Sequence, residues 1–298
     1  LNYRVYIGSM TMISINTNYG GIFAAKASSQ SQLQIDQAME RLSTGKRINH
    51  ARDDAAGQAI ATRLSAEIEG LAMASRNVAD GQSLVDTAEG ALVETHALLL
   101  RMREIGVQAA NGTLSSSDNE ALDAEFQQLV AEIDRISDNT SWAGTKLLNG
   151  DATGDYDTSA TFTFQAGVNN ATADRITIEV KNADSATLGV YVDDAGANDV
   201  NLLSMASAQT AITAVDNAIA SVSAERGKLG AVSNRMSSTM ANLDQITVNL
   251  TASKGRIEDS DFAAETGNLA KGQILQQAAT AMLAQANASK QQVLTLIR

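Results

Sequence analysis

The 298-residue sequence contains no cysteine and no proline, and only 4% of its residues are aromatic. Without cysteine the chain can form neither a disulfide framework nor a thiolate metal site. Without proline, long helices contain no residue that breaks them from within. No apolar run approaches the ~18 residues of a membrane-spanning helix, and the first residues lack the basic and then apolar pattern of a cleaved secretory signal. We therefore expect no membrane insertion and an export route that does not use such a signal.

Residues that carry catalysis or bind metals are also scarce. His50 and His96 are the only histidines and have no His-x-x-x-His or Cys partner, so a zinc site on one helix is not expected. No zinc-protease motif, nucleophile elbow or phosphate-binding loop occurs. Asp193 and Asp194 could attract calcium, but a run of acidic residues is usually a solvated surface. We predict a protein that is not an enzyme and that has no cofactor and no metal site.

The formal net charge of −12 argues against a nucleic-acid partner, because phosphate binding needs clustered Lys and Arg. The charge is uneven along the chain. Residues 151–200 hold nine acidic and two basic residues, whereas residues 1–52 hold six basic and two acidic ones. The middle is therefore expected to face solvent, and the ends are the candidates for burial.

Three long stretches show the apolar spacing of three and four residues that is typical of coiled coils. They predict helices over residues 55–110, 115–139 and 212–257, and the short loop between the first two predicts that those two run antiparallel. Polar side chains at Arg226 and Thr247 interrupt the last stretch, so that helix needs partners. The residues expected to form the helical seam are Leu64, Leu71, Val78, Val85, Leu92, Leu99, Ile219, Val222, Leu229, Met236, Leu243 and Leu250.

The spacing changes to two between residues 139 and 200. Residues 161–164 and 175–180 alternate polar with β-branched or aromatic side chains, and Gly167 and two asparagines separate them. This pattern predicts a β-hairpin.

Both ends of the chain are weakly amphipathic, rich in small and polar residues, and expected to be too poor in apolar surface to fold alone. Two outcomes are open at this point. The ends could dock on the body of the same chain. Alternatively, identical copies could pack through them, and a heterologous contact of this kind that does not close produces a helical filament.

Seven short strings of residues resemble bacterial flagellin. They are 15–18 (INTN), 40–49 (ERLSTGKRIN), 53–61 (DDAAGQAIA), 77–81 (NVADG), 256–266 (RIEDSDFAAET), 274–278 (ILQQA) and 291–296 (QQVLTL). The first four match the amino-terminal half of the family and the last three its carboxy-terminal end. The resemblance runs from Met10 nearly to the end of the chain, with the strings in the family's order. Flagellins usually carry a variable outer insert, but here only the 20 residues 182–201 separate the hairpin from the last long helix.

The resemblance implies a mainly α fold, a long antiparallel coiled-coil rod with a small β-hairpin region. In this reading residues 1–12 precede the natural start, residues 53–139 and 202–253 form the rod, and residues 140–201 form the hairpin region with a short variable segment. Residues 13–52 and 254–298 are disordered in the monomer and pair in the filament core. The residues expected to pack that core are Leu33, Ile35, Met39, Leu42, Ile274, Leu275, Ala278, Met282, Leu294 and Leu296.

The resemblance also implies a function, a location and partners. The expected function is that of a structural subunit that self-assembles into the extracellular flagellar filament used for swimming, after export through the flagellar type III channel. The implied partners are further copies of the chain, the filament cap, hook-junction proteins and an export chaperone. Arg101, Ile105 and Glu125 stand at positions similar to those read by the vertebrate flagellin-sensing Toll-like receptor, so host receptors are possible partners too.

Two alternatives remain. A hook–filament junction protein has related helical ends, although strings 53–61 and 256–266 favour flagellin. A surface-displayed homologue that binds a polysaccharide could stack sugars on Trp142, Tyr156 and Tyr191, but scattered aromatic residues are more often core or turn residues.

Overall fold

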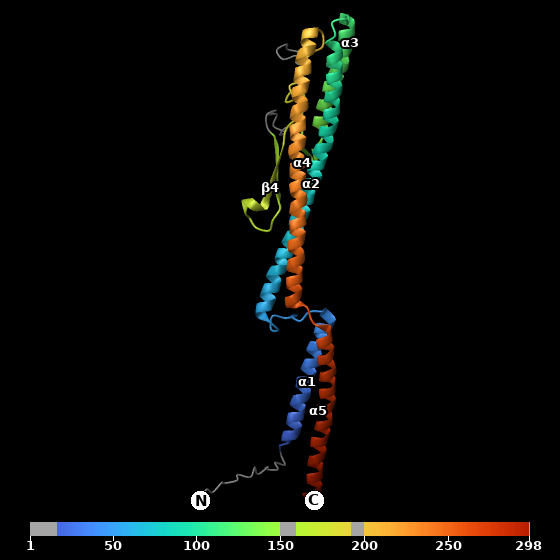
Figure 1. Cartoon of the computed structure of the whole chain (residues 1–298). Coiled ribbons are helices and arrows are strands. Elements are labelled where there is room, and N and C mark those ends of the chain that lie inside the picture. The colour runs from blue at the N-terminus through green and yellow to red at the C-terminus, as the bar shows by residue number, and fades with distance from the viewer. Residues whose placement is uncertain (1–16, 150–158, 192–199, 298) are drawn as a thin grey trace, which may run out of the picture. The chain divides into compact units, whose positions relative to one another are not determined.

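The computed structural model describes residues 17–149, 159–191 and 200–297, and the side chains of these up to residue 292 (Figure 1). The described chain divides into two compact units, which are considered separately. We call residues 1–65 and 251–298 the terminal unit, and residues 66–250 the central unit. The predicted mainly α class is confirmed. The elements are α1 (Tyr19–Thr44), α2 (Ala55–Ala109), α3 (Ser116–Asn139), β1 (Ser141–Trp142), β2 (Thr145–Lys146), β3 (Ala160–Gln165), a 3₁₀ turn (Thr172–Asp174), β4 (Arg175–Val180), α4 (Met205–Glu258) and α5 (Phe262–Ile297).

The central unit has one apolar core, to which α2, α3, α4 and both hairpins contribute. Phe126 of α3 is fully buried in it. Small residues of α2 allow a close approach: a Cβ added at Gly81 would lie 2.7 Å from the Met236 Cε of α4. Three predicted seam residues are half-buried: Ile219 and Leu250 in the central unit, and Leu64, which belongs to the terminal unit. The other nine are buried: Leu71, Val78, Val85, Leu92, Leu99, Val222, Leu229, Met236 and Leu243.

The polar residues that interrupt the seam of α4 have partners. Arg226 donates from Nε to the Glu89 carboxylate of α2 over 2.8 Å. The Thr247 hydroxyl donates to the Leu243 carbonyl, one turn earlier, over 2.8 Å. A polar group at a half-buried position costs little when it is hydrogen-bonded in this way. The interruptions therefore leave the helix continuous to Glu258.

Helix α3 begins with a capping box, as the spacing of Ser115 and Asp118 predicts. The Asp118 backbone N–H donates to the Ser115 hydroxyl oxygen over 3.3 Å, and the Ser115 backbone N–H donates to the Asp118 carboxylate over 3.0 Å. The Ser115 hydroxyl also donates to that carboxylate over 2.7 Å. The bond from the Ser115 hydroxyl, and after it the bond from the Ser115 backbone N–H, lower the pKa of the Asp118 carboxyl below its ordinary value.

Replacing Ser115 by alanine is expected to destabilise the central unit by about 1 kcal/mol near neutral pH, because the cap is lost. The melting temperature should then fall by roughly 2–4 °C. The folded-state pKa of Asp118 is lowered. The ionised carboxylate therefore stabilises the folded state above the unfolded-state pKa, and this stabilisation is lost as pH falls through the folded-state pKa. Thermal unfolding followed by circular dichroism from pH 7 to pH 3 should show the difference between the wild type and the variant narrowing in acid, while the part due to the hydroxyl's cap of the Asp118 N–H remains. A constant difference would contradict the role of the carboxylate.

The hairpin of β3 and β4 is confirmed, and its register pairs Ala160 with Val180 and Gln165 with Arg175. Burial alternates along β4, with Ile176, Ile178 and Val180 at 3%, 1% and 0% exposure. The alternation arises because successive side chains of a strand point to opposite faces. This hairpin therefore covers the helices with one apolar face.

A second hairpin, β1 with β2, was not predicted. Trp142 pairs with Thr145 across a turn in which Ala143 and Gly144 have φ angles of 49° and 85°. Two positive φ angles are typical of the tight hairpin turn whose usual sequence is Asn-Gly. Because alanine stands in place of asparagine here, the sequence does not show the usual motif of such a turn. Trp142 is half-buried and packs against the core of the central unit, which makes it a core residue rather than an exposed stacking platform. Tyr191 is 46% exposed, and Tyr156 lies outside the described residues.

Candidate functional site: the paired terminal helices

The terminal unit is built around α1 and α5, which lie side by side (Figure 1). Small residues form the contact. Those buried in α1 include Ala24, Ser31 and Ala38, which are seven residues apart, and Gly272 and Ala279 of α5 repeat the same spacing. A Cβ added at Gly272 would lie 2.8 Å from the Ile35 Cγ1. The two helices can therefore approach closely because their facing residues are small.

Polar contacts fix the register of the pair. Near one end, Arg41 donates from its Nη1 atom to the buried Glu265 carboxylate over 2.9 Å. Near the other, the Asn18 side chain donates to the Asn287 side-chain oxygen over 3.0 Å. The Asn18 side chain also caps α1 by accepting from the Gly21 backbone N–H over 3.0 Å. The two ends of the chain are thus aligned by specific contacts as well as by packing.

The turn after α1 is bonded to the junction between α4 and α5. Gly45 ends α1 with a φ of 72°, which favours glycine, and its carbonyl accepts from the Ser260 N–H over 2.9 Å. The Arg47 N–H donates to the Glu258 carbonyl over 2.6 Å, and the Lys46 ammonium lies 2.6 Å from the Glu258 carboxylate. Two turns that are far apart in the sequence are therefore joined by backbone bonds within the terminal unit.

The outer surface of the pair carries several large apolar side chains among its polar ones. Ile22 and Leu33 lie three turns apart on α1 and are 60% and 67% exposed. The other large apolar residues that are exposed among the described side chains of the two helices are Tyr19, Phe23, Met39, Phe262, Ile274, Leu275 and Met282. A contact made by small residues in only two helices leaves no interior in which these side chains could be buried. An apolar surface of this kind marks a site of interaction.

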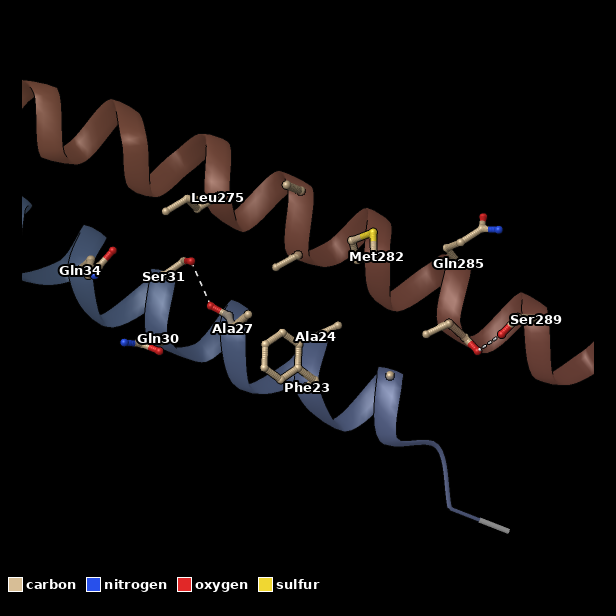
Figure 2. Close-up of a pocket in the computed structure, with 14 residues that line it drawn as sticks. Phe23, Ala24, Ala27, Gln30, Ser31, Gln34, Leu275, Met282, Gln285 and Ser289 are labelled. Carbon is tan, nitrogen blue, oxygen red and sulfur yellow. Dashed lines mark hydrogen bonds between the residues drawn. The ribbon is translucent and has the colours of Figure 1, made fainter. Parts of the chain in front are cut away.

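A groove of about 630 Å³ runs along one side of the pair (Figure 2). Phe23 and Ala27 line it from α1, and Leu275 and Met282 line it from α5. Its hydroxyl groups are already bonded: Ser31 donates to the Ala27 carbonyl over 2.9 Å, and Ser289 donates to that of Ala286 over 3.0 Å. The groove is thus suited to an apolar side chain or helix face.

The residues expected to pack the filament core have different positions in the structure. Ile35 is buried against α5, and Leu42 is half-buried. The side chains of Leu294 and Leu296 lie outside the described residues. The others are exposed on the surface of the pair: Leu33, Met39, Ile274, Leu275, Ala278 and Met282.

The sequence analysis predicted Ile35 but missed the small residues that join α1 to α5, because it searched for large apolar side chains. The signal was a seven-residue repeat of small residues in each helix. The members of the two repeats are Ala24, Ser31 and Ala38, and Gly272, Ala279 and Ala286.

The proposed receptor residues belong to the central unit. Arg101 donates from Nη2 to the Glu125 carboxylate over 2.8 Å and from Nη1 to that of Glu104 over 3.1 Å. The bonds to Glu125 and then Glu104 raise the pKa of the Arg101 guanidinium above its ordinary value. Arg101 and Glu125 are exposed, whereas Ile105 is only 1% exposed and faces the core. A role in receptor contact stays a prediction for all three.

Within the described ranges, no group of three or more His, Cys, Asp or Glu side chains is placed to hold a metal ion. Asp193 and Asp194 lie outside these ranges. No helix in the described part of the chain is both long and apolar enough to cross a membrane.

Known proteins match almost the whole sequence. The model of the bacterial flagellin N-terminal helical region matches residues 15–153, and that of the C-terminal helical region matches residues 212–297. Flagellin of Halalkalibacterium halodurans is 44% identical over 89% of this chain and 92% of its own length. Flagellin of Bacillus subtilis is 42% identical over 95% of this chain and 99% of its own length. The chain belongs to the flagellin family.

It is accordingly a structural subunit of the bacterial flagellar filament, an extracellular assembly of identical copies. The predicted function and location are confirmed at this level. A flagellar hook-associated protein from Vibrio parahaemolyticus has a similar fold, with a TM-score of 0.55 and 16% identity over 70% of this chain and 100% of that one. The flagellin matches therefore favour a filament subunit over the junction protein that was an alternative.

Proposed function

We propose that the paired helices α1 and α5 carry the contacts between subunits in the filament. The observation that supports this most directly is the set of large apolar residues exposed on the surface of the pair. Several of them are more than 60% exposed in the single chain. Removing one such side chain from water is worth about 1.5–3 kcal/mol. Neighbouring copies can supply the cover that the single chain lacks, and the occupant of the groove is then a second copy of this chain.

The distribution of charge supports the same assignment. The terminal unit contains 12 basic and 8 acidic residues, whereas the central unit contains 10 basic and 26 acidic ones. Central units that were tightly packed around one another would repel, since like charges destabilise compact assemblies. The terminal units have little net charge to oppose their contact. Burial of the ends and solvation of the middle follow from this difference.

Limited trypsin digestion tests the proposal, because it compares the ends in the monomer and in the polymer. Only five residues of α1 are buried, and four of them are Gly, Ala or Ser. The ends of the monomer should therefore open easily and be cleaved first, up to about Ala51 and beyond about Lys254. In the filament the same sites should be cleaved at least tenfold more slowly, while exposed sites of the central unit serve as the internal control. Equal cleavage of the ends in both states would contradict the proposed contacts.

We further propose that the filament cap, hook-junction proteins and an export chaperone bind this chain, and that host receptors read α2 and α3. The exposed ion pair of Arg101 and Glu125 supports the last proposal, because it presents two charged groups at a fixed position. The Ile105 side chain is buried in the core of the central unit, so it would act indirectly, by holding α2 in position. Recognition would then depend on the charged pair directly and on Ile105 through packing.

A further inference from the structure

The methionines of the chain differ sharply in exposure. Met102 and Met236 are fully buried in the core of the central unit. Among the residues that the structure describes, four others are about half exposed or more: Met39 at 55%, Met73 at 48%, Met205 at 51% and Met282 at 63%. Oxidation of methionine by peroxide requires access to the sulfur atom. The free subunit therefore presents a small set of reactive thioethers.

Met282 differs from the other exposed methionines in its surroundings. Of the methionines that the structure describes, it alone lines the groove of α1 and α5, where it lies across from Phe23 and on the same helix as Leu275 (Figure 2). Met39 belongs to the same unit but does not line this groove. Met73 and Met205 belong to the central unit. A chemical change at Met282 thus alters the groove itself.

We propose that Met282 is an oxidation site that controls polymerisation, and this rests on the proposed contact between copies at the groove. Hydrogen peroxide transfers one oxygen atom to the Met282 sulfur; the O–O bond breaks, an S–O bond forms and water leaves. The sulfur loses two electrons and the peroxide gains them. The product is a methionine sulfoxide, a polar group in place of an apolar one.

The consequence arises when a second copy covers the groove. In the free chain water can solvate the sulfoxide, because Met282 is 63% exposed. In the covered groove the sulfoxide oxygen loses this water. The hydroxyls of Ser31 and Ser289 already donate to backbone carbonyls, so the side-chain amides of Gln30, Gln34 and Gln285 are the donors that remain in the groove. Covering a polar sulfoxide in place of an apolar thioether loses the apolar burial that stabilises the contact, and it costs more wherever no amide reaches the oxygen. Oxidation should therefore act on subunits before assembly, and assembly should protect the same sulfur.

The test treats full-length monomer with hydrogen peroxide until Met282 is about half oxidised, as measured by peptide mass spectrometry. The mixture is then polymerised on filament seeds, and the oxidised fraction at each methionine is compared between polymer and supernatant. Sulfoxide at Met282 should be depleted at least fivefold from the polymer. Sulfoxide at Met73 and Met205, which are similarly exposed, should be equal in both fractions. Equal sulfoxide at Met282 in the two fractions would overturn the proposal.

Two variants complete the test. Met39 is also exposed on the pair of helices, so both variants carry Met39→Leu. Met39→Leu should lose polymerisation after peroxide treatment, whereas Met39→Leu combined with Met282→Leu should still polymerise. Methionine sulfoxide reductases of both stereochemical classes should restore assembly of the oxidised Met39→Leu variant. Peroxide sensitivity that persists in the double variant would contradict the assignment.

Failure of the underlying contact would give a different result. If the groove were not covered in the filament, Met282 in preformed filaments would oxidise as fast as in monomer, and Phe23→Asp, a change at the groove lining, would assemble normally. If Phe23→Asp blocked assembly while Met282 sulfoxide entered the polymer freely, the inference about oxidation alone would be wrong.

Discussion

Replacing Ile274 by aspartate is expected to abolish filament formation while the central unit stays folded. Ile274 is 66% exposed on α5, so the monomer gains an exposed carboxylate at little cost. In the filament that carboxylate would be buried where an apolar side chain contributes about 1.5–3 kcal/mol, and an unpaired buried charge costs several kcal/mol more. The critical concentration for polymerisation should rise by two orders of magnitude or more, as measured by sedimentation after seeding.

The matched control for this change is Ile274→Val, which keeps an apolar side chain of similar shape. It should polymerise with a critical concentration within about tenfold of the wild type, because only one methylene group is lost. Circular dichroism of both variants should match that of the wild-type monomer. Normal assembly of Ile274→Asp would show that this face of α5 is not buried between copies.

Replacing Leu99 by alanine is expected to give the largest loss of stability among single changes in the predicted seam. Leu99 is 0% exposed in the core of the central unit. Deleting a fully buried leucine side chain costs about 2–5 kcal/mol, through lost burial and the cavity that remains. For a unit of this size the melting temperature should fall by roughly 5–15 °C. Thermal unfolding of the monomer, followed at the helical signal, measures the change.

The neighbouring residue supplies the control. Leu100 has the same side chain and is 45% exposed, so Leu100→Ala should change the free energy of unfolding by about 0.5 kcal/mol or less. The two variants have the same composition and nearly the same effect on helix propensity. Equal melting temperatures for the two would contradict the placement of the seam that the three-and-four spacing predicts.

Several elements of the central unit could be read from the sequence because each depends on local order. The spacing of apolar residues located α2 and the end of α4 within one residue, but placed the start of α4 at residue 212 instead of Met205. Ser115 with Asp118 located the start of α3. The alternation in residues 175–180 located β4. A helix or strand with one apolar face must turn that face toward a core, so the period of the pattern is enough to assign it. The β1–β2 hairpin was not predicted because Ala143 has a positive φ at a position where Asn or Gly is usual.

The assembly surface was only partly readable. The sequence by itself determined that the ends of the chain are helical, weakly apolar and low in net charge, and its short strings of residues identified the family. Only the tertiary structure decided which residues of the ends face each other. The seven-residue repeats of small residues bring α1 against α5 and so leave Leu33, Ile274 and Met282 outside. The spacing of apolar residues shows which side chains are stabilised by burial. Whether the same chain or another copy buries them depends on the shape of the opposing surface.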